Sequence, residues 1–152
     1  MRNTISDLRL VNKVDHIGMA VPSLDKALIF YKKIFGCEAD DTLSLPDDGL
    51  LIAFIQLENL RIELLQPVGG DSPIKGLLEG YTVNQYIKDN PSGGMHHVCY
   101  GVSNLFEIVQ KIQNDGGRIL GDGRDWLGAD GNPITFIDPE YTDGILLELK
   151  EK

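Results

Sequence analysis

The sequence predicts an α+β fold in which one pattern, a strand, a helix and three further strands, is written twice. The stretch "VDHIGMAV" (14–21) alternates small and bulky residues and runs directly into a helical pattern, and "HVCYGV" (97–102) does the same in the second half. The two strands carry His16 and His97 at matching places, 81 residues apart. A repeat of this length indicates two duplicated half-domains rather than a solenoid.

In the first half, His16 shares one face of its strand with small residues, while bulky apolar residues occupy the other face. The following "PSLDKALIFYKKIFG" has helical apolar spacing, with Ser23 as a plausible N-cap and Gly36 as a stop. After a polar, turn-rich passage, the apolar runs "LLIAFIQL" and "LRIELLQPV" predict a hairpin.

In the second half, His97 shares a strand face with Cys99 and Gly101, and "SNLFEIVQKIQNDGG" predicts a capped amphipathic helix that ends at glycines. Three strand candidates follow, in "RILGDG", "NPITFIDP" and "GILLELK". Between the halves, Ser72 and Pro73 predict the start of a short helix, followed by an irregular linker.

The chain length of 152 residues suits a single domain. We expect a first module at about residues 12–70, a linker at about 71–94 and a second module at about 95–152.

Composition narrows the possible partners. A net charge of -9 without a lysine or arginine cluster argues against a nucleic acid or an anionic membrane surface, which leaves small molecules and proteins. Cys37 and Cys99 lie far apart in the sequence, so we expect neither a disulfide framework nor a thiolate zinc site. Neither a signal peptide nor a membrane span is apparent. The expected location is the cytoplasm, or an organelle matrix if a targeting peptide has been removed.

The duplicated polar residues point to a metal. Glu63 in "IELL" and Glu148 in "LELK" each lie between apolar neighbours on the fourth strand of a half, 85 residues apart. A buried, unpaired carboxylate is costly, and metal coordination makes it tolerable. Together with His16 and His97 they would give two histidines and two glutamates around one divalent ion, with Lewis-acidic positions left open.

Each residue alone has a plainer explanation. A single strand histidine is usually structural, and a glutamate on an edge strand usually faces solvent. The recurrence of all four at the same places in two diverged halves favours the joint site. His96 is expected to point to the strand face opposite His97 and to be a capped, partly exposed residue.

The chain resembles the vicinal oxygen chelate superfamily, and within it the methylmalonyl-CoA epimerase family, almost from end to end. The stretches that carry the resemblance are "VDHIGMAVPSLDKALIFYKKIFG", "LRIELLQPVGGDSPI", "NPSGGMHHVCYGV", "LGADGNPITFIDP" and "GILLELKE". The first is shared widely in the superfamily, whereas "IELLQP" with "DSPI" and "GGMHHVCYGV" are more specific to the epimerases.

The resemblance implies a cupped mixed sheet around a central metal site, with His16, Glu63, His97 and Glu148 as ligands and cobalt, nickel, manganese or zinc as the ion. It implies a homodimer and an acyl-CoA substrate. The implied reaction interconverts (R)- and (S)-methylmalonyl-CoA by removing the proton alpha to the thioester. A carboxylate beside the metal is the natural base, first Glu148, with Glu63 as its partner on the other side.

Three features depart from the family pattern. Ile52 stands where some epimerases have an additional glutamate, and Asp138 stands where histidine is usual. The linker at 76–91 is longer than expected, and it would either cover the thioester pocket or narrow the choice of substrate.

Two other functions fit the same fold. A glyoxalase I-type lactoylglutathione lyase would use the same four residues on a hemithioacetal, and a non-enzymatic small-molecule binder would need no metal set. Function follows from the site rather than from the fold.

Overall fold

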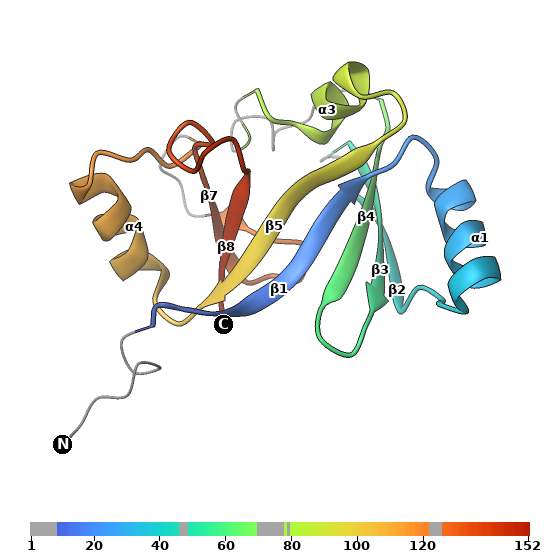
Figure 1. The fold of residues 1–152 in the computed structure, drawn as a ribbon, viewed down its shortest axis with the longest axis horizontal. Coiled ribbons are helices and arrows are strands. Elements are labelled where there is room, and N and C mark those ends of the chain that lie inside the picture. The colour runs from blue at the N-terminus through green and yellow to red at the C-terminus, as the bar shows by residue number, and fades with distance from the viewer. Residues whose placement is uncertain (1–8, 46–48, 70–77, 79, 122–125) are drawn as a thin grey trace.

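The computed structural model describes residues 9–45, 49–69, 78, 80–121 and 126–152 (Figure 1). In chain order, the elements are β1 (Val11–Ala20), α1 (Leu24–Phe35), β2 (Asp41–Leu45), β3 (Leu50–Gln56), β4 (Arg61–Pro67), α3 (Val83–Asp89), β5 (Gly94–Val102), α4 (Leu105–Asn114), β6 (Trp126–Leu127), β7 (Pro133–Ile137) and β8 (Leu147–Glu151). Among these described helices, none is long and apolar enough to cross a membrane.

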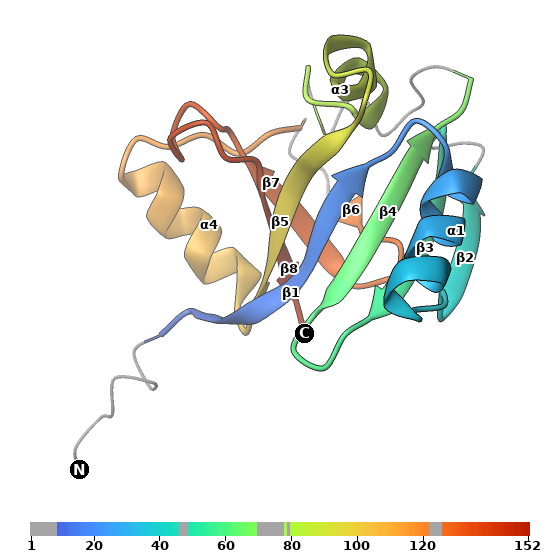
Figure 2. The same ribbon diagram turned by 45° about the vertical axis from the view of Figure 1, so that its right-hand side comes forward.

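The strands join one mixed sheet in the order β2-β3-β4-β1-β5-β8-β7-β6. In each half the first strand pairs in parallel with the fourth, β1 with β4 and β5 with β8, and the halves meet where β1 pairs antiparallel with β5. The sheet curls behind these two central strands, with α1 and α4 on its flanks (Figures 1 and 2). The predicted α+β fold of two βαβββ halves is therefore confirmed.

The two faces of β1 divide as the sequence pattern predicts. His16 and Ala20 are buried on the inner face, and Ile17 and Met19 pack on the outer face in the cluster that includes α1. Packing on the outer face removes apolar surface from water, which stabilises the fold by about 25 cal/mol for each Å² buried. It leaves the inner face of the central strands free for polar side chains.

Helix α1 begins and ends at the predicted residues. The Ser23 side chain accepts a hydrogen bond from the backbone N–H of Lys26, at 3.3 Å. Gly36 adopts the left-handed conformation, with φ 68°, and donates from its backbone N–H to the Lys32 carbonyl. A residue with a Cβ is disfavoured there, which explains the glycine.

Some expected elements differ. "RILGDG" forms no named strand in its described part. Ile119 makes only an isolated bridge to Ile137. The first of the three strands that follow α4 in the chain is β6 instead. The helix predicted from Ser72 and Pro73 lies outside the described residues, and the linker helix that is seen, α3, is capped by Thr82. The polar β2 was not predicted separately, because a mostly exposed edge strand lacks a strong apolar alternation.

Three register shifts interrupt the central β1–β5 pairing, and two of them are bulges next to the site histidines. Val14 pairs with Tyr100 and His16 with Cys99, so Asp15 is an extra residue on β1. On β5, His97 pairs with Gly18 and Met95 with Met19, so His96 is an extra residue. A bulge re-aims the side chains beside it. Here it places one extra polar residue immediately before each histidine.

Candidate metal centre

The four predicted ligand residues converge on the inner face of the sheet. His16 comes from β1, Glu63 from β4, His97 from β5 and Glu148 from β8, and all four are buried. Each histidine directs Nε2 toward the other, with 3.2 Å between the two nitrogens. Four side chains from four strands, far apart in the sequence, thus meet at one point.

The carboxylates complete the cluster. Oε1 of Glu148 lies 3.0 Å from Nε2 of His16 and 3.4 Å from Nε2 of His97. The two oxygens of Glu63 lie 3.6 and 3.8 Å from the same two nitrogens, Oε2 nearer His16 and Oε1 nearer His97. Ligands that each lie about 2.0–2.2 Å from a shared ion are about 3.0–3.6 Å apart, which is close to this spacing.

The chemistry of the donors also fits a metal. Among the described residues, His16, Glu63 and His97 form a group whose ligand atoms all lie within 4.8 Å of one another. Oε1 of Glu148 is buried and accepts no well-directed hydrogen bond within the described chain. A set of two imidazoles and two carboxylates suits a borderline divalent ion, and the two negative charges would balance it.

A buried carboxylate, that of Asp15, forms a hydrogen bond with Nδ1 of His16, the ring nitrogen farther from the cluster. Asp15 accepts a hydrogen bond from Nδ1 of His16 at 2.8 Å, and it also contacts Nζ of Lys150 at 2.7 Å and of Lys152 at 2.6 Å. Lys150 makes a second ion pair with Asp130, at 2.6 Å. Burial alone would raise the pKa of Asp15, but hydrogen bonds from His16, Lys150 and Lys152 hold it well below its ordinary value. The carboxylate therefore stays ionised and keeps Nδ1 of His16 protonated.

His16 itself is strongly basic. Burial lowers its pKa, but hydrogen bonding with Asp15 and Cys99, together with the adjacent carboxylate of Glu148, outweighs this and raises the pKa to about 12. A metal bound at Nε2 would therefore have to displace a proton, and its affinity would rise with pH.

The two glutamates differ in acidity. Burial, reinforced by the nearby charge of Glu148, raises the pKa of Glu63. Burial also acts to raise the pKa of Glu148, but the imidazoles of His16 and His97 beside it lower the pKa overall. Two carboxylates whose surroundings push their pKa values apart are typical of a site that moves protons.

The expectation for His96 was wrong. It is 8% exposed and lies against His97, with 2.9 Å between the two Nδ1 atoms, because the β5 bulge turns it toward the same side. Its Nε2 lies 2.6 Å from the backbone carbonyl oxygen of Tyr81. Burial and the neighbouring His97 lower the pKa of His96 to about 3.

An apolar pocket of about 180 Å³ opens beside the four ligand-type residues. Ile52, which replaces the additional glutamate of some epimerases, lies in its wall. The described part of the linker contributes Leu78 and Val83, so the linker forms part of the pocket wall. The remaining apolar lining consists of Leu50, Leu65, Leu127, Ala129, Ile134 and Phe136. A polar cluster at the end of an apolar pocket is the usual form of a small-molecule site.

Asp138 does not line this pocket. Its carboxylate accepts hydrogen bonds from Nε of Arg118 at 2.9 Å and from the backbone N–H of Glu140 at 3.0 Å, which fixes the turn after β7. The roles of Asp15 and Lys150 were not predicted, because a bulge and a buried ion pair leave no periodic pattern in the sequence. The polar residue immediately before each duplicated histidine was the one available signal.

Comparison with known proteins gives a consistent picture. Residues 15–136 match the Glyoxalase/Bleomycin resistance protein/Dioxygenase superfamily. The ethylmalonyl-CoA/methylmalonyl-CoA epimerase of Cereibacter sphaeroides is 37% identical over 93% of this chain and 99% of its own length. The mitochondrial methylmalonyl-CoA epimerase of Bos taurus is 38% identical over 93% of this chain and 75% of its own. A variant of the Streptomyces coelicolor methylmalonyl-CoA epimerase, solved in complex with 2-nitronate-propionyl-CoA, superimposes with a TM-score of 0.77 at 26% identity, covering 93% of this chain and 98% of that one.

Proposed function

This chain belongs to the Glyoxalase/Bleomycin resistance protein/Dioxygenase superfamily, and from that premise we propose that it is a metal-dependent epimerase that interconverts (R)- and (S)-methylmalonyl-CoA. The observation that carries the proposal is the convergence of two histidines and two glutamates at the end of an apolar pocket, in a chain closely similar to named epimerases. These relatives favour the epimerase over a lactoylglutathione lyase or a non-enzymatic binder.

In this proposal the four site residues have two roles, metal binding and proton transfer. His16 and His97 would hold the ion through Nε2, and the two glutamates would complete its ligands. When bound, a divalent metal supplies a Lewis acid that stabilises negative charge on carbonyl oxygens. The C2 proton of methylmalonyl-CoA lies between a thioester and a carboxylate and is therefore acidic. Glu148 takes this proton from one face of C2, and Glu63, whose pKa burial raises, delivers a proton to the opposite face, which inverts the centre.

The first prediction concerns proton exchange at C2 of methylmalonyl-CoA in deuterium oxide. Protein stripped of metal by a chelator should exchange no C2 proton above the background rate, and Co²⁺ should restore exchange, because charge on the acyl oxygens is stabilised only with the ion present. Mass spectrometry of the recovered thioester measures the deuterium gained. Full exchange by the stripped protein would contradict the metal-dependent mechanism. A protein that binds one Co²⁺ without exchange would direct the search to hemithioacetal substrates.

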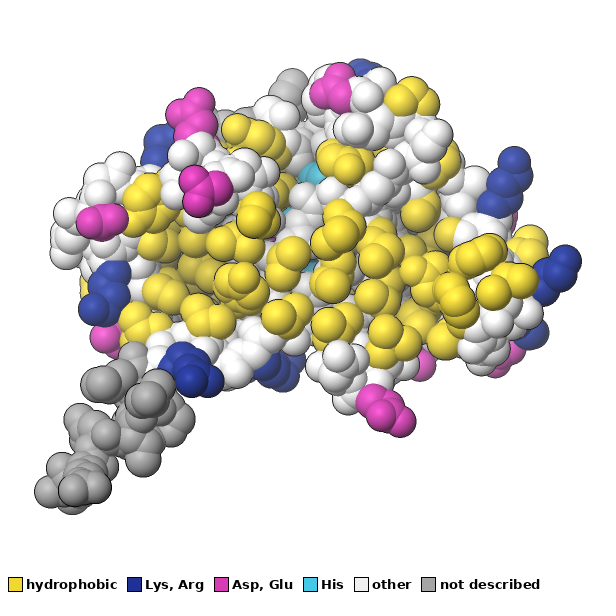
Figure 3. Space-filling view, in the orientation of Figure 1, with side chains coloured by type: hydrophobic (Ala, Val, Ile, Leu, Met, Phe, Trp, Pro, Cys, Tyr) yellow, Lys and Arg dark blue, Asp and Glu magenta, His cyan; other side chains and the backbone are white. Residues whose placement is uncertain are grey.

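We also propose that two copies associate through the outer face of the sheet. Figure 3 shows apolar side chains spread across this face from one helix to the other. The exposed apolar residues on its elements include Val14 on β1, Phe30 on α1 and Phe106 on α4. Monomeric proteins rarely expose apolar patches larger than a few hundred Å². A second copy offers a matching apolar surface, because a twofold interface brings the same patch together from both partners.

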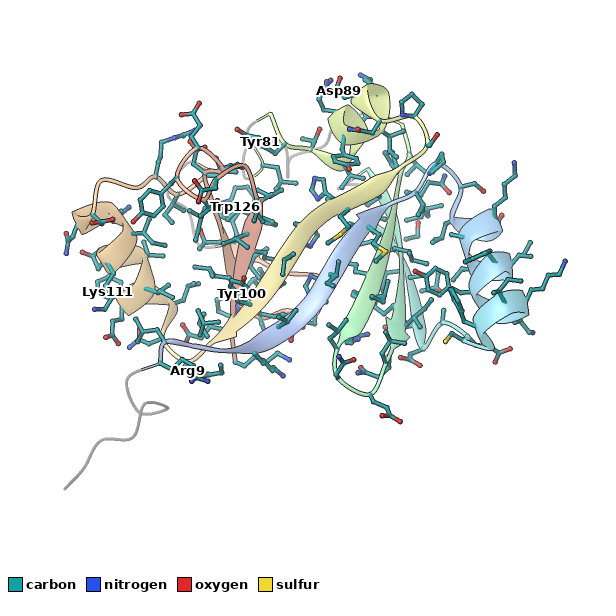
Figure 4. The ribbon with its side chains drawn as sticks, viewed as in Figure 1. Arg9, Tyr81, Asp89, Tyr100, Lys111 and Trp126 are labelled. Carbon is teal, nitrogen blue, oxygen red and sulfur yellow. The ribbon has the colours of Figure 1, made fainter. Side chains whose placement is uncertain are left out.

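Sedimentation equilibrium tests this association. The wild-type protein should sediment as a dimer, and Val14→Glu should sediment as a monomer, because it would bury two new charges in the proposed interface. Asp89→Lys on α3, at the top of Figure 4, is the control and should remain a dimer. A monomeric wild-type protein at micromolar concentration would rule out the proposed interface.

A further inference from the structure

The residue before each site histidine is a bulge residue that contacts Nδ1 of that histidine. Asp15 lies 2.8 Å from Nδ1 of His16, and Nδ1 of His96 lies 2.9 Å from Nδ1 of His97. We propose that His96 is a positioning residue, which fixes the tautomer and orientation of His97 for metal binding and ties this ligand to the linker at Tyr81. The inference rests on the proposed metal site.

The hydrogen bonds around His96 allow one assignment of protons. The Tyr81 carbonyl oxygen can only accept, so Nε2 of His96, 2.6 Å away, carries a proton and donates it. His97 must keep Nε2 bare to bind a metal, so its proton is on Nδ1. That N–H then donates to Nδ1 of His96, which must be bare. His97 thus donates to His96, and His96 donates to the backbone carbonyl of Tyr81.

The ring of His96 also makes two ring contacts. It meets the rings of His97 and Tyr86 edge to face, with centroid distances of 5.2 and 5.7 Å. Tyr81 lies on the segment that leads into α3, at the top of Figure 4, and its backbone N–H donates to the Leu78 carbonyl at 2.7 Å. Because Leu78 lines the apolar pocket, the same short segment shapes the pocket and anchors the support of His97.

The two histidines thus receive different support. Asp15 is a charged acceptor, and Lys150 and Lys152 balance its charge. His96 is a neutral acceptor and requires no cation beside it. Hydrogen bonds from a ligand histidine to such partners fix its tautomer and raise its basicity, and their removal typically weakens metal binding by about 10–100-fold.

Metal affinity tests the inference without reference to activity. The dissociation constant for Co²⁺, measured by competition with a fluorescent chelator, should rise by about 10–100-fold in His96→Leu, which removes the acceptor and the donor. His96→Asn places an amide oxygen near the position of Nδ1 and should recover most of the loss. Tyr86→Leu is the matched control, because it removes a ring packed on His96 but neither of its hydrogen bonds. Its Co²⁺ affinity should match the wild-type affinity, although its denaturation midpoint should fall.

The outcomes separate this inference from the proposed function. A folded His96→Leu variant that binds Co²⁺ as tightly as the wild type overturns the role of His96 and leaves the metal site standing. A wild-type protein that binds no Co²⁺ overturns both.

A measurement on the wild-type protein does not depend on any variant. The sequence contains three histidines, His16, His96 and His97, so each ring can be resolved in long-range ¹H–¹⁵N spectra of the Zn²⁺-loaded protein. We expect a proton on Nε2 and a bare Nδ1 for His96, with a proton on Nδ1 of His97. A proton on Nδ1 of His96 would overturn the inference.

Discussion

Glu148→Gln should slow the interconversion of the two methylmalonyl-CoA epimers by about 10³-fold or more while the protein still binds Co²⁺. The amide keeps the size of the side chain and one carbonyl oxygen for the metal, but it cannot accept the C2 proton. Glu148 is buried, and the imidazoles of His16 and His97 beside it lower its pKa, so the native carboxylate is ionised and ready to accept. The measurement is epimerisation followed by chiral resolution of the product, with the Co²⁺ content determined in parallel.

Glu63→Gln is the matched variant, and the two should fail in different ways. Both should lose interconversion in both directions, because inversion needs a group on each face of C2. Each should still exchange the C2 proton of one epimer with deuterium, and the epimer should be opposite in the two variants. A Glu148→Gln protein that binds Co²⁺ and epimerises at nearly the wild-type rate would show that Glu148 is not the base.

Much of this arrangement follows from sequence periodicity. Alternation on β1 and β5 placed His16 and His97 on the face opposite the bulky residues, and the duplicated pattern put Glu63 and Glu148 on the fourth strands. Parallel pairing of first and fourth strands then brings each glutamate beside its histidine: Glu63 pairs with Gly18, and Glu148 with Cys99. The structure brings the four together, and their roles as ligands and bases remain predictions.

The support around the site was not predictable in the same way. The assumption of strict alternation gave the wrong side for His96, because a bulge adds one residue and changes the direction of the side chains beside it. The ion pairs that join Asp15 to Lys150, and Lys150 to Asp130, link β1, β8 and the loop between β6 and β7. Only the three-dimensional pairing of those segments shows that Asp15 and Lys150 can be buried together.

Gly18→Ala should weaken Co²⁺ binding by about 100-fold or more, since it would displace a ligand rather than a residue that supports one. The imidazole of His97 lies directly over Gly18. A Cβ at Gly18 would lie 2.1 Å from Cε1, 2.4 Å from Nδ1 and 2.6 Å from Nε2 of the ring. The ring has little freedom to retreat, because His96 holds Nδ1 and Phe136 packs against it with 5.8 Å between the ring centroids. Such overpacking also costs about 1–3 kcal/mol of folding free energy.

Gly101→Ala distinguishes a specific effect from a general intolerance of side chains on this face. The nearest atoms to a Cβ at Gly101 belong to the side chain of Lys13, with Cγ at 3.2 Å and Cε at 3.3 Å, and this exposed chain can move aside. Its Co²⁺ affinity should therefore stay at the wild-type value, whereas that of Gly18→Ala falls. Calorimetric titration of both variants with Co²⁺, alongside their urea denaturation curves, makes the comparison. If folded Gly18→Ala bound Co²⁺ with wild-type affinity, His97 would not be a ligand in the orientation described, because a methyl group and the ring cannot share that space.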